Sequence, residues 1–264
     1  MSEVLKVERS DGVARVTLAR PEVRNTFNAE LIAAVRDTFE HLRDEPATTL
    51  RAVVLSGEGK TFCAGADVEW QLNARDLEMD ANEADVGRLQ EMLATIDNCP
   101  VPVVAAVHGA ALGGGMALCC VADITLTTAD AIFGFTEVKL GLIPAAISPF
   151  VLSRIGEGPA RALFLTGERF GSEHALRIGV VSEVLADQPA LDARVAAILD
   201  EIQSAAPEAV RNAKAMIRGQ RDMPRGDAMD RTRASAARQR VSPEGQEGLG
   251  AFLEKRPPSW RDGG

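Results

Sequence analysis

Three short segments of this sequence carry residue types suited to acid–base chemistry on a carbonyl compound. Residues 62–67 and 112–117 are small-residue turns that each follow an apolar, strand-like run, and Glu137 is a lone acid further along the chain. Small residues let a ligand approach the backbone closely, and free N–H groups at a helix start attract negative charge. Two such N–H groups converging on one carbonyl oxygen would form an oxyanion hole, with the acid moving the proton. Such turns also serve as ordinary packing elements, so their order and content carry the argument.

Length and charge bound the fold and the partners. The 264 residues predict one large domain, or a core domain with a smaller appendage, and a 46% hydrophobic content suits a substantial core. A net charge of −9 argues against a nucleic-acid partner, because phosphate binding needs clustered Lys and Arg. Four basic residues do recur at helical spacing, and they indicate either a solvated helix face or a local basic pocket: Arg211, Lys214, Arg218 and Arg221.

Cysteine and histidine usage favours a cytoplasmic protein without a metal. The four cysteines show neither C-x-x-C spacing nor a partner-histidine pattern, and the three histidines are scattered. We therefore expect buried thiols in a reducing compartment and no metal site. No signal segment and no apolar run of about 20 residues is apparent, so no membrane partner is expected.

Alternating strand and helix patterns predict an α/β core over residues 1–186. Residues 4–8 and 13–18 read as a hairpin, and Asn28 is a good N-cap for the helix that follows. Strands are expected at 52–55, 101–107, 124–126 and 131–133, with a helix at 82–98 and a short one from the 113–115 turn to about 121. Strands that alternate with helices imply right-handed crossovers.

The remaining region, 187–264, has a wholly helical pattern. Helices are expected at 189–204, 207–219 and 227–240, and Ser242 with Pro243 starts a last one. This amphipathic, Arg-rich region suits packing on its own core or on another subunit.

The order of these motifs resembles the crotonase, or enoyl-CoA hydratase/isomerase, superfamily. The resemblance covers nearly the whole chain and rests on Arg20-Pro21, Asn25, Asn28, Gly65-Ala66-Asp67, His108-Gly109 to Gly115, Asp123, residues 137–144 and residues 251–256. It implies a spiral of ββα units with a C-terminal helical trimerisation region, assembled as a homo-oligomer, either trimer or hexamer. It also implies an acyl-CoA substrate and no separate cofactor, since coenzyme A is part of that substrate.

The resemblance also implies roles for individual residues. Ala66 and Gly114 match the two backbone N–H donors that stabilise an enolate, and Glu137 matches a catalytic acid. Its apolar surroundings should raise its pKa by desolvation, although a salt-bridged or capping acid is the plain alternative. The positions expected at the substrate are Arg24 for the phosphates, Ala64 beside the pantetheine arm, Gly113 and Ala117 in the second turn, and Phe252 and Lys255 in a tail that often comes from a neighbouring subunit. Asp67 is expected to cap the following segment or to touch the ligand.

One position departs from the family pattern. Hydratases of this family usually carry two glutamates around the substrate double bond, and the first of them matches Ala117, which cannot ionise. A hydratase resembling the 3-methylglutaconyl-CoA type is the first expectation, because residues 142–150 and 166–170 look like that group. The alternatives are an enoyl-CoA isomerase using the same lone glutamate, an enzyme whose acid lies in the acidic 69–90 segment, and a non-catalytic acyl-CoA-binding protein.

Overall fold

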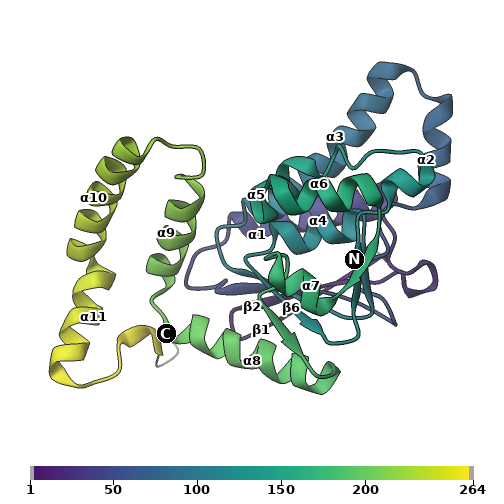
Figure 1. Cartoon of the computed structure of the whole chain (residues 1–264). Helices are drawn as coiled ribbons and strands as arrows, with labels where there is room; N and C mark the ends of the chain where they lie inside the picture. The colour runs from purple at the N-terminus through teal and green to yellow at the C-terminus, as the bar shows by residue number, and fades with distance from the viewer. Residues whose placement is uncertain (1–2, 262–264) are drawn as a thin grey trace.

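The core is a six-stranded sheet in which an N-terminal hairpin leads into parallel strands. A computed structural model describes residues 3–261, and its sheet has the order β1-β2-β3-β4-β6-β9 (Figure 1). The strands are β1 (Leu5–Ser10), β2 (Val13–Leu18), β3 (Ala52–Gly57), β4 (Val103–Val107), β6 (Ile124–Thr128) and β9 (Glu183–Leu185). The pair β1–β2 is antiparallel and the pairs after it are parallel, so the expected hairpin and α/β architecture are confirmed.

Helices bury one face of this sheet. They are α1 (Ala29–Arg43), α3 (Met79–Asp97) and α4 (Gly114–Val121), and their apolar residues join alternate residues of β2, β3 and β4 in one large core. The Asn28 side chain accepts a hydrogen bond from the Leu31 N–H, which confirms the predicted cap. Every residue of β4 is buried, as its unbroken apolar sequence predicts for a strand covered on both faces.

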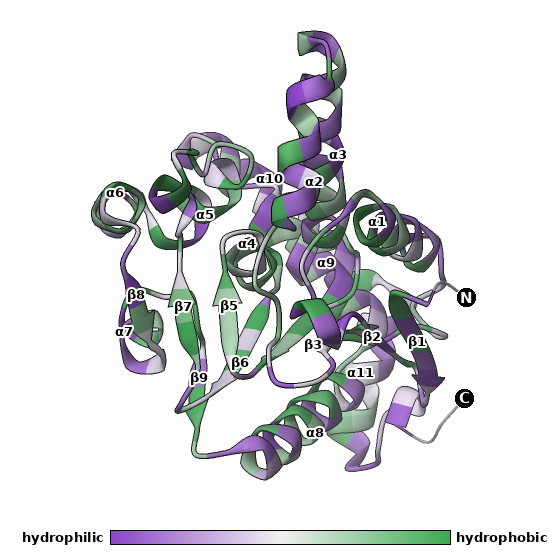
Figure 2. Cartoon of the chain, turned by 90° about the vertical axis from the view of Figure 1, so that its right-hand side faces the viewer, coloured by the Kyte–Doolittle hydropathy of each residue, from purple (hydrophilic) through white to green (hydrophobic). Residues whose placement is uncertain are grey.

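The opposite face of the sheet is covered by a helix from the expected C-terminal region. Leu191, Val195, Ile198 and Leu199 of α8 (Gln188–Ser204) pack against the other alternate residues of β2, β3, β4 and β6. Figure 2 shows α8 on the side of the sheet away from α1 and α4. The first helix of region 187–264 therefore completes the core.

A smaller sheet extends the core toward the two small-residue turns. Its order is β5-β7-β8, from β5 (Ala110–Leu112), β7 (Ile132–Gly134) and β8 (Arg169–Gly171). Around it lie α5 (Ser148–Ile155), α6 (Glu157–Thr166) and α7 (Ser172–Arg177). The 69–90 segment is also helical, comprising α2 (Val68–Asn73), a single turn at Ala74–Asp76 and the first half of α3.

The last three helices stand away from the core as an arm (Figure 1). They are α9 (Pro207–Arg218), α10 (Arg225–Val241) and α11 (Pro243–Glu254), and the Ser242 side chain caps α11 as expected. Of the two alternatives for the basic residues of α9, the solvated face does not hold for Lys214, which is 8% exposed and donates to the Val101 carbonyl at 2.9 Å and to Asp123 at 2.5 Å. Within the described residues, no helix is both long and apolar enough to span a bilayer.

Candidate active site

Backbone pairing brings the two small-residue turns together. Cys63 forms a parallel bridge with Ala111, since its N–H donates to the Ala110 carbonyl and its carbonyl accepts from the Leu112 N–H. Beyond this bridge the first turn reaches the start of α4, since a Cβ at Gly114 would lie 3.9 Å from the Gly65 Cα. A hydrogen-bonded ladder thus juxtaposes turns that lie far apart in the sequence.

The N–H groups of Ala66 and Gly114 are left free at this junction. Among residues 3–261, neither group has a protein acceptor, whereas the neighbouring N–H groups of Phe27, Asp67 and Gly113 donate to carbonyl oxygens. Gly114 is the first residue of α4, where a helix leaves its N–H groups without intrahelical partners. Two unpaired donors in neighbouring turns, one of them at a helix start, favour a negatively charged oxygen.

A side chain at any of the three glycines of the second turn would crowd a neighbouring group. A Cβ at Gly113, which also has a φ of +49°, would lie 3.1 Å from Glu137 Oε1. A Cβ at Gly114 would lie 2.7 Å from the Phe27 ring, and one at Gly115 would lie 2.3 Å from the Cys63 carbonyl oxygen. The run of three glycines therefore lets α4 start directly against the first turn and against the acid.

Glu137 presents a protonatable carboxyl to the same place. It opens a short 3-10 turn, Glu137–Leu140, that follows β7, and its Oε2 is buried with no hydrogen-bond partner among the described residues. Burial raises the pKa of Glu137, and a backbone hydrogen bond lowers it by a smaller amount. The carboxylate of Glu137 forms no salt bridge within residues 3–261, so the salt-bridged alternative is not supported.

A largely apolar hollow of about 400 Å³ opens from this junction. Its walls are mostly Ala, Leu, Ile, Val, Pro and Trp side chains from α2, α3 and residues 140–147, including Trp70, Val86 and Leu89. Within the described part of the chain, Glu137 is its only ionisable lining residue, and Gln71, Asn82 and Thr136 are its other polar side chains. The hollow suits a short apolar ligand held against one acid.

A second hollow, of about 820 Å³, adjoins the first and is more polar. The two share the lining residues Ala64, Ala66, Thr136 and Leu140. Three cations line the second hollow, Arg24, Lys139 and Arg169, together with three acids, Glu22, Asp67 and Glu168. A ligand lying across both hollows would pass Ala66, which lines both, and would reach Gly114 in the first.

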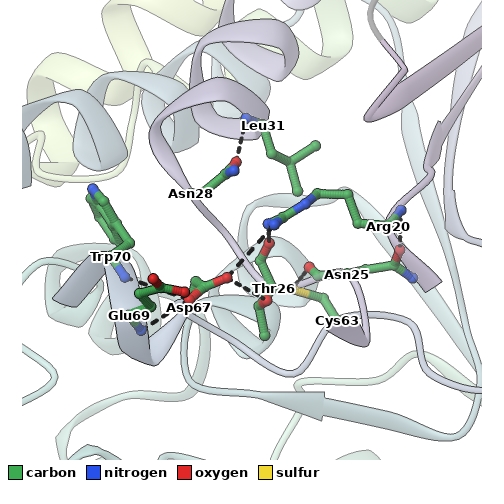
Figure 3. A network of polar contacts seen from close by, with 9 residues as sticks. All are labelled: Arg20, Asn25, Thr26, Asn28, Leu31, Cys63, Asp67, Glu69 and Trp70. Atoms are coloured by element: carbon green, nitrogen blue, oxygen red, sulfur yellow. Dashed lines mark hydrogen bonds and ion pairs between the residues drawn. The ribbon is translucent and has the colours of Figure 1, made fainter. Parts of the chain in front are cut away.

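Polar contacts hold the first turn in place (Figure 3). Asp67 caps α2 by accepting hydrogen bonds from the Glu69 and Trp70 N–H groups, and it lies 3.6 Å from the Arg20 guanidinium. Asn25, which is fully buried, donates to the carbonyls of Glu58, Thr61 and Phe62 and accepts from the Arg20 N–H. The predicted cap at Asp67 is confirmed, and its place beside the second hollow keeps a ligand contact open.

The structure brings together most residues predicted for the site and leaves three outside it. Glu137, Ala66, Gly114, Gly113, Ala64, Arg24 and Asp67 line one or both hollows. Ala117 does not line either hollow, because it lies within α4 with its side chain fully buried. Phe252 is 81% exposed on the arm, and neither Phe252 nor Lys255 lines a hollow of its own chain, so a contact from a neighbouring subunit stays a prediction.

Sequence reasoning missed several lining residues. Thr136 and Lys139 flank Glu137, so their proximity along the chain was an available signal. Trp70 and Val86 lie in the 69–90 segment, whose acidic composition gives no local sign of an apolar wall, and Arg169 lies on a three-residue strand that carries no periodicity.

Comparisons with known proteins agree with this architecture. The family model described as Enoyl-CoA hydratase/isomerase matches residues 8–263. AtuE of Pseudomonas aeruginosa aligns with a TM-score of 0.94 and 37% identity over 98% of this chain and 100% of that one. An enoyl-CoA hydratase of Shewanella pealeana aligns with a TM-score of 0.92 and 35% identity over 97% and 96%. Enoyl-CoA hydratase AKT6-1 of Alternaria alternata is 34% identical, covering 82% of this chain and 70% of that protein.

The family model matches nearly the whole chain, and the solved structures align with it over almost its full length. This chain belongs to the enoyl-CoA hydratase/isomerase family, the crotonase superfamily.

Proposed function

We propose that this protein adds water to the double bond of a 2-enoyl-CoA thioester, with Glu137 as its single acid–base group. One observation, on the two carboxyl oxygens of Glu137, carries the proposal. Oε2 is buried without a hydrogen-bond partner among the described residues, and Oε1 would lie 3.1 Å from a Cβ at Gly113 in the second turn. The acid is thereby next to the free N–H groups of Ala66 and Gly114. Relatives named enoyl-CoA hydratases support the reaction class.

The reaction needs charge stabilisation first. Water attacks C3, the double-bond electrons move to the thioester oxygen, and an enolate forms there. The N–H groups of Ala66 and Gly114 donate to that oxygen as its charge develops. Removing one such donor in an acyl-transfer enzyme costs about 2.7–4 kcal/mol, so two donors supply a large share of the rate enhancement.

Glu137 then accounts for both proton transfers. As a carboxylate it takes a proton from the attacking water, and as a carboxylic acid it returns that proton to C2 of the enolate. A pKa raised by burial brings the group toward the working pH, where one residue can do both steps. No second acid is required, which accommodates Ala117.

The second hollow suits the coenzyme A arm. Its cations Arg24, Lys139 and Arg169 are positioned to meet phosphates, and Ala64 and Ala66 leave room for the pantetheine chain where the hollows join. Phe252 and Lys255 would reach the same ligand only from a neighbouring subunit, so this part of the proposal requires a homo-oligomer.

An isomerase is the second candidate, and the lining of the apolar hollow favours it. A single ionisable residue is sufficient to move a proton between C2 and C4, and Glu137 is the only one there within residues 3–261. A non-catalytic acyl-CoA-binding role would leave the raised pKa of Glu137 without a use.

Absorbance of the conjugated thioester separates these candidates. A 2-enoyl-CoA loses this absorbance on hydration, whereas a 3-enoyl-CoA gains it on isomerisation. We expect loss with crotonyl-CoA, and no loss with Glu137→Gln at unchanged acyl-CoA affinity. Gain with a 3-enoyl-CoA and no loss with any 2-enoyl-CoA would establish the isomerase, and neither signal would leave binding alone.

A further inference from the structure

We propose that the acyl group accepted by this protein is uncharged near its reacting carbons, and that short dicarboxylic enoyl-CoA thioesters are discriminated against. The inference rests on the proposed function and narrows its substrate class. It departs from the 3-methylglutaconyl-like acyl group that the sequence favoured, because that group carries a second carboxylate.

The charges around the apolar hollow carry the argument. No Lys, Arg or His is among its described lining residues, and the one ionisable group there is the acid Glu137. A carboxylate entering beside Glu137 would lose its hydration without gaining a cation. It would also repel the carboxylate form of Glu137, which is the form that activates water.

The cations that line the adjoining hollow serve a different part of the ligand. Arg24, Lys139 and Arg169 line the second hollow, on the far side of the boundary formed by Ala64, Ala66, Thr136 and Leu140. Their positive charge is therefore directed at the coenzyme A end, while the acyl end is left with neutral walls.

The α3 residues that line the hollow change along the helix from apolar to polar but uncharged. Asn82, Val86 and Leu89 follow one another at helical spacing and all line the hollow, with Leu89 buried and Val86 42% exposed. Across from them, Gln71 of α2 also lines the hollow, and neither its side-chain amide nor that of Asn82 has a hydrogen-bond partner among residues 3–261. Amides can serve a neutral hydrogen-bonding group without countering a charge.

Two substrates of equal chain length test the proposal. Pent-2-enoyl-CoA and glutaconyl-CoA differ in that a terminal methyl is replaced by a carboxylate. We expect kcat/KM of the wild-type protein to be at least roughly tenfold lower for glutaconyl-CoA. An equal or higher kcat/KM for glutaconyl-CoA would overturn the inference.

A cation placed on the wall supplies a matched comparison. Val86→Arg should reduce the preference for pent-2-enoyl-CoA by about tenfold relative to Val86→Met, which is long but neutral. An unchanged ratio of kcat/KM for the two substrates in a folded Val86→Arg protein would overturn the electrostatic argument.

Binding measurements separate this inference from the proposed reaction. Calorimetry with pentanoyl-CoA and glutaryl-CoA needs no turnover, and we expect at least roughly tenfold weaker binding of glutaryl-CoA. If no enoyl-CoA is turned over and this difference is found, the proposed reaction fails and the inference stands. Equal affinities would overturn the inference even if hydration is observed.

Discussion

Replacing Gly114 with alanine tests the site geometry with a single methyl group. A Cβ there would lie 2.7 and 2.8 Å from two carbons of the Phe27 ring. Carbon atoms in contact lie about 3.5–4.0 Å apart, so either the ring or the start of α4 must move by roughly 1 Å. Phe27 is fully buried, and its N–H and carbonyl are bonded to Gly65 and Asp67, so we expect the helix start to move.

That movement takes the Gly114 N–H away from the thioester oxygen. A misplacement of about 1 Å costs on the order of 10²-fold, and loss of an oxyanion donor costs about 10²–10³-fold in kcat. We expect kcat to fall by about 10²–10³, with a much smaller change in the Kd of a saturated acyl-CoA, because the donor acts mainly on the transition state. Overpacking should lower the free energy of unfolding by about 1–3 kcal/mol.

The assay is loss of conjugated-thioester absorbance, with folding checked by urea denaturation. Gly158→Ala on α6 is the matched control, because an added Cβ at that position meets nothing within 4 Å. The double variant with Phe27→Leu removes the ring edge and should recover part of the lost kcat. A folded Gly114→Ala protein with wild-type kcat would refute the assignment of this N–H group.

Three further predictions concern stability. Burial raises the pKa of Glu137 in the folded protein, so Glu137→Gln should raise Tm at pH values above that pKa. The gain should vanish at pH values below the unfolded pKa of about 4.3, where the carboxyl is neutral in both the folded and the unfolded state. An equal gain in Tm at all pH values would contradict this. Lys214→Met leaves the Asp123 carboxylate without its cation. The free energy of unfolding, measured by urea denaturation, should fall by roughly 2–3 kcal/mol, which is below the full cost of breaking a buried pair because Asp123 is partly exposed. A change near zero would be inconsistent with this ion pair. Asp67→Ala removes the α2 cap and should cost about 1 kcal/mol in the same assay, whereas no loss would show that the cap is dispensable.

Local signals predicted most of the elements. The β1–β2 hairpin, the Asn28 and Ser242 caps and the fully buried β4 each follow from a few neighbouring residues. The turn at residues 113–115 leads into α4, as the glycine run before an apolar stretch predicts. Motif order then identified the family, which packing patterns alone would not have done.

The remaining features depend on contacts between distant segments. Lys214 has the spacing of a solvated residue, and only the meeting of α9 with Asp123 buries it. The register of Cys63 with Ala111, which brings the two small-residue turns together, is a long-range pairing that no local pattern reports. The neutral wall of the hollow is likewise invisible in the sequence, because α2 and α3 come from a segment whose overall composition is acidic.

Oxygen labelling tests the central claim most directly. A 2-enoyl-CoA is incubated with the protein in ¹⁸O-labelled water, and the product is analysed by mass spectrometry. We predict one labelled hydroxyl at C3 with the wild-type protein and none with Glu137→Gln. A product whose double bond has moved without taking up label, or equal labelling by Glu137→Gln, would contradict the account.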